Sequence, residues 1–268
     1  MKRDTGIMSA LFEEPGPRTR RKIARYTILS LLLLAAACAL LVRQFYETGQ
    51  LSSRYWDFFL RRTTWLFLGK GLLGTVRVAL VAVCLTLAMG FLMMLSRVRG
   101  NRVWGMAGRL ATDFTRGVPT LLFIYFFYFV TPQLGIMLSA FWKITLPVAI
   151  SASGSVAEVL RGGVNAVHRG QREAALSLGL SENRTFFKII FPQAFAYVIP
   201  SLISELVIIL KDTTFAYIVS FNDLMQNASV LISNYDALLS VYLVVAVIYI
   251  LINYLLNRLS VALAGMRR

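Results

Sequence analysis

The sequence has little of what most catalytic or metal sites need. His168 is the only histidine, and the two cysteines, Cys38 and Cys84, both lie inside apolar runs. A single histidine excludes most zinc chemistry and most histidine-based general-base schemes, and two such cysteines predict neither a disulfide framework nor a thiolate metal site. The P-loop motif G-x-x-x-x-G-K-[ST] is also missing, so any work driven by ATP must come from a partner protein.

Acidic residues are scarce as well, with 13 Asp and Glu against 28 Lys and Arg and a net charge of +15. In a soluble protein this balance would suggest nucleic acid. Here 57% hydrophobic residues and a mean hydropathy of +0.65 indicate an integral membrane protein instead. Twenty of the 28 basic residues fall in 1–25, 97–116, 161–188 and 258–268, which one topology places on a single side. The positive-inside rule makes that side cytoplasmic, so the charge sets orientation and predicts no nucleic-acid partner.

Long apolar runs predict an all-α membrane protein with six transmembrane helices. Each expected helix has about 17–25 residues, enough to cross a hydrocarbon core of about 30 Å. Six helices make this a multi-pass protein of the cell membrane with both termini in the cytoplasm, and a basic loop is expected at 96–109. The expected spans are 26–45, 71–95, 114–131, 141–164, 196–219 and 238–259.

The chain is expected to divide into a basic cytoplasmic tail (1–25), an extra first helix (26–46), an outer interfacial segment (47–70) and a core (71–260). The tail contains Pro-Gly-Pro and is expected to be disordered. A signal peptide is the alternative, but the basic region is too long and no small-residue cleavage site follows Val42. The interfacial segment mixes aromatic residues with arginines, which is typical of an amphipathic element at a membrane surface.

The most polar stretch of the core is 168–195. Residues 171–178 are good helix formers, with Glu173 placed near the expected N-terminus, where a carboxylate complements the helix dipole. Gly179 fits a left-handed C-cap, and Ser181 can cap a second helix that runs towards Pro192. We therefore predict a helical hairpin on the cytoplasmic side.

The spacing in this hairpin follows the order E-A-A, three residues, G, nine residues, I, two residues, P. The positions are filled by Glu173, Ala174, Ala175, Gly179, Ile189 and Pro192. This pattern resembles the EAA loop of the membrane subunits of binding-protein-dependent ABC importers. In that family the loop is the coupling helix that docks in a groove of the cytoplasmic ATPase. The alternative is an ordinary cytoplasmic hairpin, because E-A-A alone is common.

Four stretches resemble the polar amino acid permeases of these importers, the histidine, glutamine and glutamate group, over about 70–258. They are TRGVPT (115–120), AEVLRGG (157–163), GQREAA (170–175) and LKDTT (210–214). The opening 14–18 and the extra first helix look most like permeases for glutamate uptake. Phe191 stands where the loop often has Leu, and Glu205 follows Ser204 where many relatives have Asn-Gln.

The resemblance implies that this chain is a transport subunit without an ATPase site or cofactor of its own. Its implied partners are two ATPase subunits that bind ATP and Mg²⁺, a second homologous permease, an extracytoplasmic solute-binding protein and the lipid bilayer. It also implies a five-helix core, with the first helix as an addition.

Ionisable residues inside the expected spans are candidates for a substrate path, because each costs at least about 2.5 kcal/mol in the bilayer unless it faces the bundle or water. Arg77 enters from the outer side, and its planar fork suits a substrate carboxylate. The alternative is that these residues form structural pairs, since Glu158 and Arg161 are three residues apart, or that they snorkel to the membrane surface near the helix ends. The candidate path residues are Arg77, Glu158, Glu205, Lys211, Asp212 and Thr213.

Two other classes of function are weighed against the permease. An ion- or proton-coupled secondary transporter would also use buried charges, but it predicts repeated halves, and the sequence has no internal repeat. A membrane enzyme would need clustered carboxylates, histidines or serine motifs at one interface, and no such spacing occurs. Neither alternative accounts for the EAA-type spacing.

Overall fold

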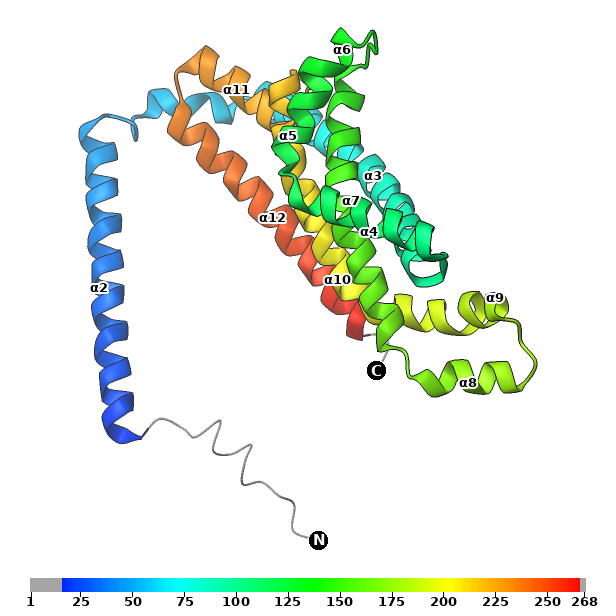
Figure 1. Cartoon of the computed structure of the whole chain (residues 1–268). Coiled ribbons are helices and arrows are strands. Elements are labelled where there is room, and N and C mark those ends of the chain that lie inside the picture. Colours follow the sequence, from blue (N-terminus) through cyan, green and yellow to red (C-terminus); the bar gives the residue numbers. More distant parts are fainter. Residues whose placement is uncertain (1–15, 266–268) are drawn as a thin grey trace. The chain divides into compact units, whose positions relative to one another are not determined.

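The chain forms helices in two compact units (Figure 1). The computed structural model describes residues 16–265. One unit extends to Trp56 and the other begins at Asp57. Within the described residues five helices are long and apolar enough to cross a membrane, or six if one bent pair counts as a single span, and none of these residues forms a strand. This confirms the predicted all-α membrane fold.

The first unit contains α2 (Pro17–Glu47) and the short 3₁₀ helix η1 (Ser53–Tyr55). Proline is well placed at the start of α2, where its missing N–H leaves no bond unmade. The predicted disorder of the tail is wrong for residues 17–25, which are helical, while 1–15 lie outside the described residues. Within its unit α2 buries none of its residues. An apolar helix exposed on every side fits a lipid environment.

The second unit is a bundle built around α7 (Ala140–Ala166), which contacts α3, α10, α4 and α5. Small residues let these helices approach closely. A Cβ on Gly90 of α3 would lie 2.9 Å from the carbonyl oxygen of Ser153 on α7. The other elements are η2 (Asp57–Leu60), α3 (Arg62–Arg99), α4 (Arg102–Gly117), α5 (Thr120–Tyr125), η3 (Phe126–Val130), α6 (Thr131–Gln133), α8 (Arg169–Ser177), α9 (Glu182–Thr185), η4 (Phe186–Ile190), α10 (Phe191–Asp212), η5 (Thr213–Val219), α11 (Leu224–Tyr235) and α12 (Leu238–Gly265).

The predicted third span is not one straight helix. The pair α4 and α5–α6 bends by 95° at the break between Gly117 and Thr120. Pro119 has no N–H and keeps Val118 in an extended conformation, with ψ 124°, so the helix ends there. The predicted basic loop at 96–109 is also wrong, because α3 continues to Arg99 and α4 already begins at Arg102.

The second helix of the polar hairpin does not stop at Pro192. The helical path runs from Glu182 to Val219 through α9, the π-helical turn η4, α10 and the 3₁₀ turn η5. Pro192 has no N–H to donate within the helix. The π-helical turn η4 directly before it shifts the backbone hydrogen bonds by one residue, so the helix continues past the proline. At the other end of the bundle, α11 is an element that the sequence analysis did not predict.

Candidate functional site

The turn of the α8–α9 hairpin has the geometry that its sequence predicts. Gly179 has φ +79°, its N–H donates to the carbonyl of Leu176 at 2.9 Å, and the N–H of Leu180 donates to Ala175 at 3.1 Å. These two bonds form a Schellman motif, which requires a left-handed residue at the position of Gly179. The Ser181 hydroxyl then accepts from the N–H of Arg184 at 3.4 Å, so the predicted caps are confirmed.

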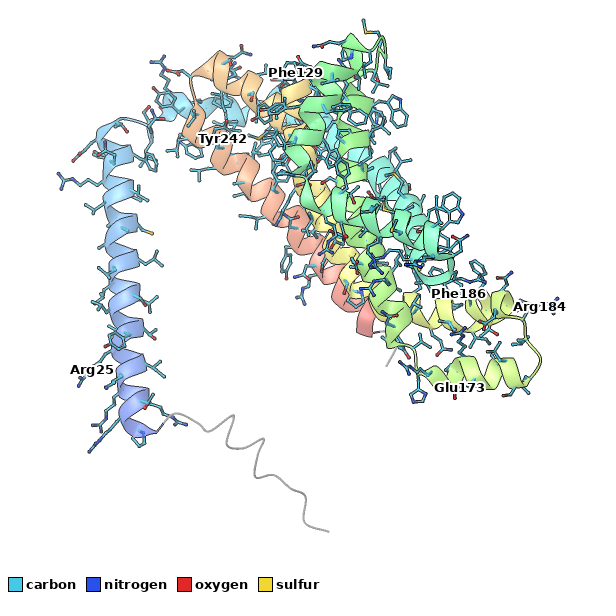
Figure 2. The ribbon with its side chains drawn as sticks, in the orientation of Figure 1. Arg25, Phe129, Glu173, Arg184, Phe186 and Tyr242 are labelled. Carbon is cyan, nitrogen blue, oxygen red and sulfur yellow. The ribbon has the colours of Figure 1, made fainter. Side chains whose placement is uncertain are left out.

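Helix α8 starts earlier than predicted, with the Nδ1 atom of His168 accepting the N–H of Gly170 at 3.1 Å. Glu173 is therefore the fifth helical residue and lies beyond the first turn, so the predicted interaction with the helix N-terminus is wrong. Figure 2 shows Glu173 and Arg184 on the hairpin at one end of the second unit, with Phe129 and Tyr242 at the other end.

The hairpin presents an exposed surface. Glu173, Ala174 and Leu178 are exposed, and Leu178 reaches 83%, whereas Ala175 is buried between the two helices. An alanine flanked by an exposed leucine and a carboxylate leaves room for another protein backbone to come close. Pro192 lies at the start of α10, away from this surface.

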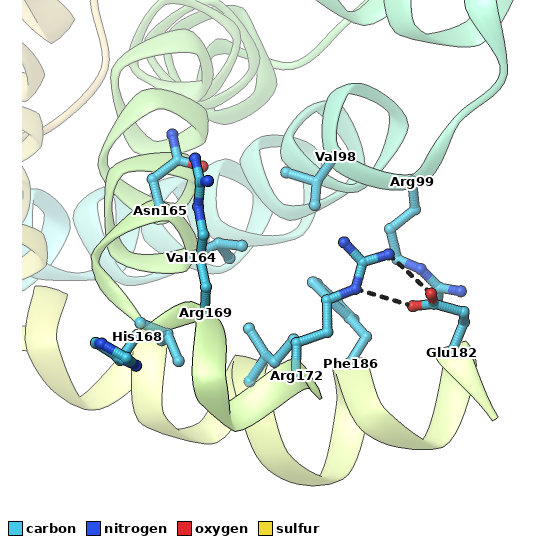
Figure 3. A pocket seen from close by; sticks show the side chains of 11 residues that line it. Val98, Arg99, Val164, Asn165, His168, Arg169, Arg172, Glu182 and Phe186 are labelled. Carbon is cyan, nitrogen blue, oxygen red and sulfur yellow. Dashed lines mark hydrogen bonds and ion pairs between the residues drawn. The ribbon is translucent and has the colours of Figure 1, made fainter. Parts of the chain in front are cut away.

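An ion pair and a pocket of about 790 Å³ lie on the inner side of the hairpin (Figure 3). Arg172 of α8 donates to Glu182 of α9 at 2.8 and 3.3 Å, and both side chains are more than half exposed. Such a surface pair adds little stability. Arg99 at the end of α3 donates to Asn183, and its guanidinium lies 5.1 Å from the ring centre of Phe186. Arg99 therefore ties the hairpin to α3.

Glu158 forms the main charged cluster of the bundle. Its carboxylate accepts from Arg97 of α3 and from Arg161 at 2.8 and 3.0 Å, and Arg116 of α4 lies 4.0 Å away. The pairing of Glu158 with Arg161 that the spacing allowed is confirmed. The contacts with Arg97 and Arg116 connect α7 to α3 and α4, and sequence reasoning missed both because those residues are distant in the chain.

Asp212 belongs to a second polar contact, at the end of α10. It accepts the Thr120 hydroxyl at 2.9 Å, and the same hydroxyl lies 2.9 Å from that of Ser151 on α7. The neighbouring Thr213 is fully buried and donates to the carbonyl of Leu210 at 2.7 Å. Lys211 is exposed, and the part of the chain described here gives it no ion-pair partner.

The remaining path candidates are less enclosed. Glu205 is half-buried on α10, within reach of the positive charge of Arg116. Arg77 is exposed on α3, and among residues 16–265 it has no ion-pair partner, neither Glu158 nor Glu205. The structure thus groups Glu158 with three arginines and Asp212 with Thr120, and leaves Arg77 on an outer surface of this chain.

A buried carboxyl group that the sequence analysis missed lies between η5 and α11, outside the membrane-length helices. Asp223 is fully buried, and its Oδ1 atom caps α11 by accepting the N–H of Gln226 at 2.7 Å. Its Oδ2 atom has no hydrogen-bond partner among the residues that the structure describes. Burial raises the pKa of Asp223 to about 6, against the opposing effect of the backbone N–H groups of Gln226 and Met225. The sequence signal for this site was an aspartate directly before the apolar residues of α11, which is typical of a helix N-cap.

Residues 82–265 match the family described as binding-protein-dependent transport system inner membrane component. The chain belongs to this family. It is 32% identical over 216 residues to a glutamate transport system permease protein of Corynebacterium glutamicum, covering 79% of both chains. It is 30% identical over 194 residues to a probable glutamine ABC transporter permease protein of Bacillus subtilis, covering 71% of this chain and 89% of the relative.

A crystal structure of an amino acid ABC transporter with histidines superposes on this inner membrane component with a TM-score of 0.73 at 27% identity, covering 78% of this chain and 98% of that one. The family match starts at residue 82 and so includes α7, the hairpin, α10 and α12, but not α2. The resemblance inferred from the EAA-type spacing is thereby confirmed.

Proposed function

We propose that this inner membrane component is the permease subunit of an ABC importer for a polar amino acid, with glutamate as the first choice of substrate. The observation that carries the proposal is the α8–α9 hairpin, whose Schellman turn at Gly179 fixes an exposed surface at one end of a membrane bundle. The glutamate and glutamine permeases among its relatives support an amino acid as substrate.

The proposed mechanism assigns ATP chemistry to partners. Two ATPase subunits bind ATP and Mg²⁺ and receive α8 through the surface of Glu173, Ala174 and Leu178. A second homologous permease completes the pathway, and an extracytoplasmic binding protein delivers the amino acid. This chain supplies the helices and the polar groups of the path, for which we retain Arg77 as the cation for a substrate carboxylate.

The proposal requires the hairpin to face the cytoplasm. In Figure 1 the end of α12 lies at the same end of the second unit as α8 and α9, whereas α11 and α6 lie at the other end. Leu178 and Leu60 are 83% and 87% exposed, so a cysteine at either position can be labelled. A membrane-impermeant maleimide added outside intact cells should label Leu60→Cys and spare Leu178→Cys. Labelling of Leu178→Cys from outside contradicts the proposal, because no ATPase could reach the hairpin.

Transport itself is tested by co-expressing the chain with its partner subunits and reconstituting the complex in proteoliposomes with the binding protein. ATP-dependent uptake of glutamate is expected to exceed that of glutamine or arginine. If another amino acid is taken up instead, the proposed substrate is wrong but the proposed role as a permease stands. No ATP-dependent uptake of any amino acid, by a complex that has assembled, refutes the role.

A substitution in the turn tests the coupling surface. Gly179→Val forces a β-branched residue into a left-handed conformation, which costs about 1–2 kcal/mol or more, although no atom lies within 4 Å of the new Cβ. ATP hydrolysis stimulated by the loaded binding protein should fall while the complex remains assembled. Gly69→Val is the matched control, because Gly69 has helical backbone and equally open surroundings. Equal stimulation in both variants argues against coupling through this turn.

A further inference from the structure

Four arginines line a pocket of about 530 Å³ where α3 ends, α4 begins and α7 passes beside them. They are Arg97, Arg102, Arg109 and Arg161, and no acidic residue is among the pocket's lining residues in the described chain. We call this the arginine pocket. The end of α3 and the start of α4, which line the pocket, lie towards the end of the second unit that carries the hairpin (Figure 1).

Glycines give the pocket its shape, because they let α4 lie directly against the end of α3. A Cβ on Gly108 would collide with the Ser96 hydroxyl, and one on Gly100 would collide with the Ser96 carbonyl. The Asn101 side chain accepts the N–H of Trp104 at 3.0 Å and so starts α4 at the rim of the pocket. The close contact at Gly108 therefore holds α4, which carries Arg102 and Arg109, against the end of α3, which carries Arg97.

The charge around the pocket is not balanced by the chain itself. Arg97 and Arg161 share the single carboxylate of Glu158 with Arg116. Arg102 and Arg109 are exposed and form no ion pair within residues 16–265.

The acidic residues on neighbouring positions do not remove this excess. Asp113 lies one turn beyond Arg109 on α4, but it is exposed and makes no ion pair with any other described residue. Glu205 is within reach of Arg116, which does not line the pocket. A group of five arginines with one bound carboxylate at a membrane boundary favours an anion from outside the chain.

The surface of α4 beside the pocket is apolar and largely exposed, although the Phe114 ring packs edge-on against Phe123 with ring centres 5.7 Å apart. Its exposed side chains are Val103, Trp104, Met106, Leu110 and Phe114, each 59–73% exposed. Helix α4 is also bent by 95° from α5–α6, which belong to the same candidate span. An amphipathic helix with a tryptophan and arginines at its boundary is typical of an element that lies in the membrane interface, with acyl chains against its apolar side.

We propose that the arginine pocket binds the headgroup of an anionic phospholipid, in the leaflet on the hairpin side. The lipid phosphate pairs with Arg102 and Arg109, and its acyl chains cover the apolar side chains of α4. Because Arg97 and Arg161 also hold Glu158, the bound headgroup joins α3, α4 and α7 in one charged cluster. This inference does not depend on the transported substrate.

The test compares two variants of the full chain that lose the same charge. Arg102→Gln/Arg109→Gln removes the two unpaired arginines of the pocket. Arg61→Gln/Arg62→Gln removes two exposed arginines at the other end of α3 and serves as the control. Each protein is placed in phosphatidylcholine nanodiscs with or without phosphatidylglycerol, and retained phosphatidylglycerol is measured by native mass spectrometry.

The pocket variant should bind phosphatidylglycerol about thirty-fold more weakly than the unchanged chain, on the basis of about 1 kcal/mol for each arginine near an anionic surface. The Arg61→Gln/Arg62→Gln control should bind phosphatidylglycerol as tightly as the unchanged chain. Equal binding in both variants overturns the proposal. A further arm adds inorganic phosphate in phosphatidylcholine nanodiscs. In this arm the Tm of the unchanged chain is compared between nanodiscs with added phosphate and nanodiscs with phosphatidylglycerol. If free phosphate raises the Tm as much as phosphatidylglycerol does, the pocket is a site for soluble anions and the lipid proposal is wrong.

Discussion

Replacing Glu158 with glutamine tests whether this residue acts mainly as a clamp between helices. The glutamine keeps the size of the side chain and can still accept one hydrogen bond, but it removes the charge that Arg97 and Arg161 share. The Arg97 side chain is 13% exposed and that of Glu158 is 22% exposed, so their interaction is only weakly screened. The Arg161 side chain is 38% exposed and contributes less.

The loss of stability can be bounded from these contacts. A hydrogen bond to a charged group contributes about 1.5–3 kcal/mol when it is shielded from water, and an exposed pair on one helix contributes about 0.3–0.5 kcal/mol. We therefore expect Glu158→Gln to lower the free energy of unfolding by about 2–3 kcal/mol. For a bundle of this size that corresponds to a fall in Tm of about 4–12 °C.

The assay is thermal unfolding of the purified full chain in detergent, followed by intrinsic fluorescence. Glu182→Gln is the matched control, because it makes the same substitution in the exposed pair with Arg172 and should change the Tm far less. The double variant Arg97→Gln/Glu158→Gln should be more stable than the sum of the single losses predicts. Equal Tm changes for the two glutamate variants would refute the reasoning. Reduced uptake by Glu158→Gln with an unchanged Tm would favour its role in the substrate path.

Two further predictions concern Arg77 and Asp223. Arg77→Met keeps an apolar stem on an exposed face of α3, so insertion should be unchanged while the apparent affinity for uptake falls about ten-fold or more, the equivalent of about 1.5–3 kcal/mol for a charge-assisted hydrogen bond. Unchanged uptake kinetics would remove Arg77 from the path. The pKa of Asp223 is raised from 3.8 to about 6, so its favourable contribution is complete below about pH 4 and is lost as the pH rises through about 6. Up to about 3 kcal/mol of stability should disappear over this range, and Asp223→Asn, which retains the cap, should flatten the Tm profile between pH 4 and 8. A profile that stays steep in Asp223→Asn shows that another group is responsible.

Local signals in the sequence were enough to predict the hairpin. Gly179 and Ser181 are cap residues whose conformations depend on their nearest neighbours, and the structure has both as expected. The apolar run of 114–131 was a weaker guide. Hydropathy alone fits one span there, whereas the helix breaks between Gly117 and Thr120, where Pro119 lacks an N–H.

The charged contacts could not be predicted from spacing, apart from Glu158 with Arg161. Arg97 is 61 residues from Glu158, and Thr120 is 92 residues from Asp212. Which of many distant residues meets a buried charge depends on how the helices cross, and that is set by small residues such as Gly90 and Gly108. For the same reason the sequence could not show that Asp223 is buried with one oxygen unpaired.

The hairpin is attached to the bundle differently at its two ends. On the side of α7 the helix stops at Ala166, and Val167 and His168 form a short joint of extended backbone before α8. On the other side α9 continues into α10 without a break, and α10 alone is about 33 Å long at a rise of about 1.5 Å per residue. A force applied to the exposed surface of α8 would turn the hairpin about Val167 against the restraint of its contacts with Arg99 of α3, and α10 would move with it because α9 continues into α10. The far end of α10 is the place where Asp212 meets Thr120, so a displacement of the hairpin would reach that contact through the helix backbone.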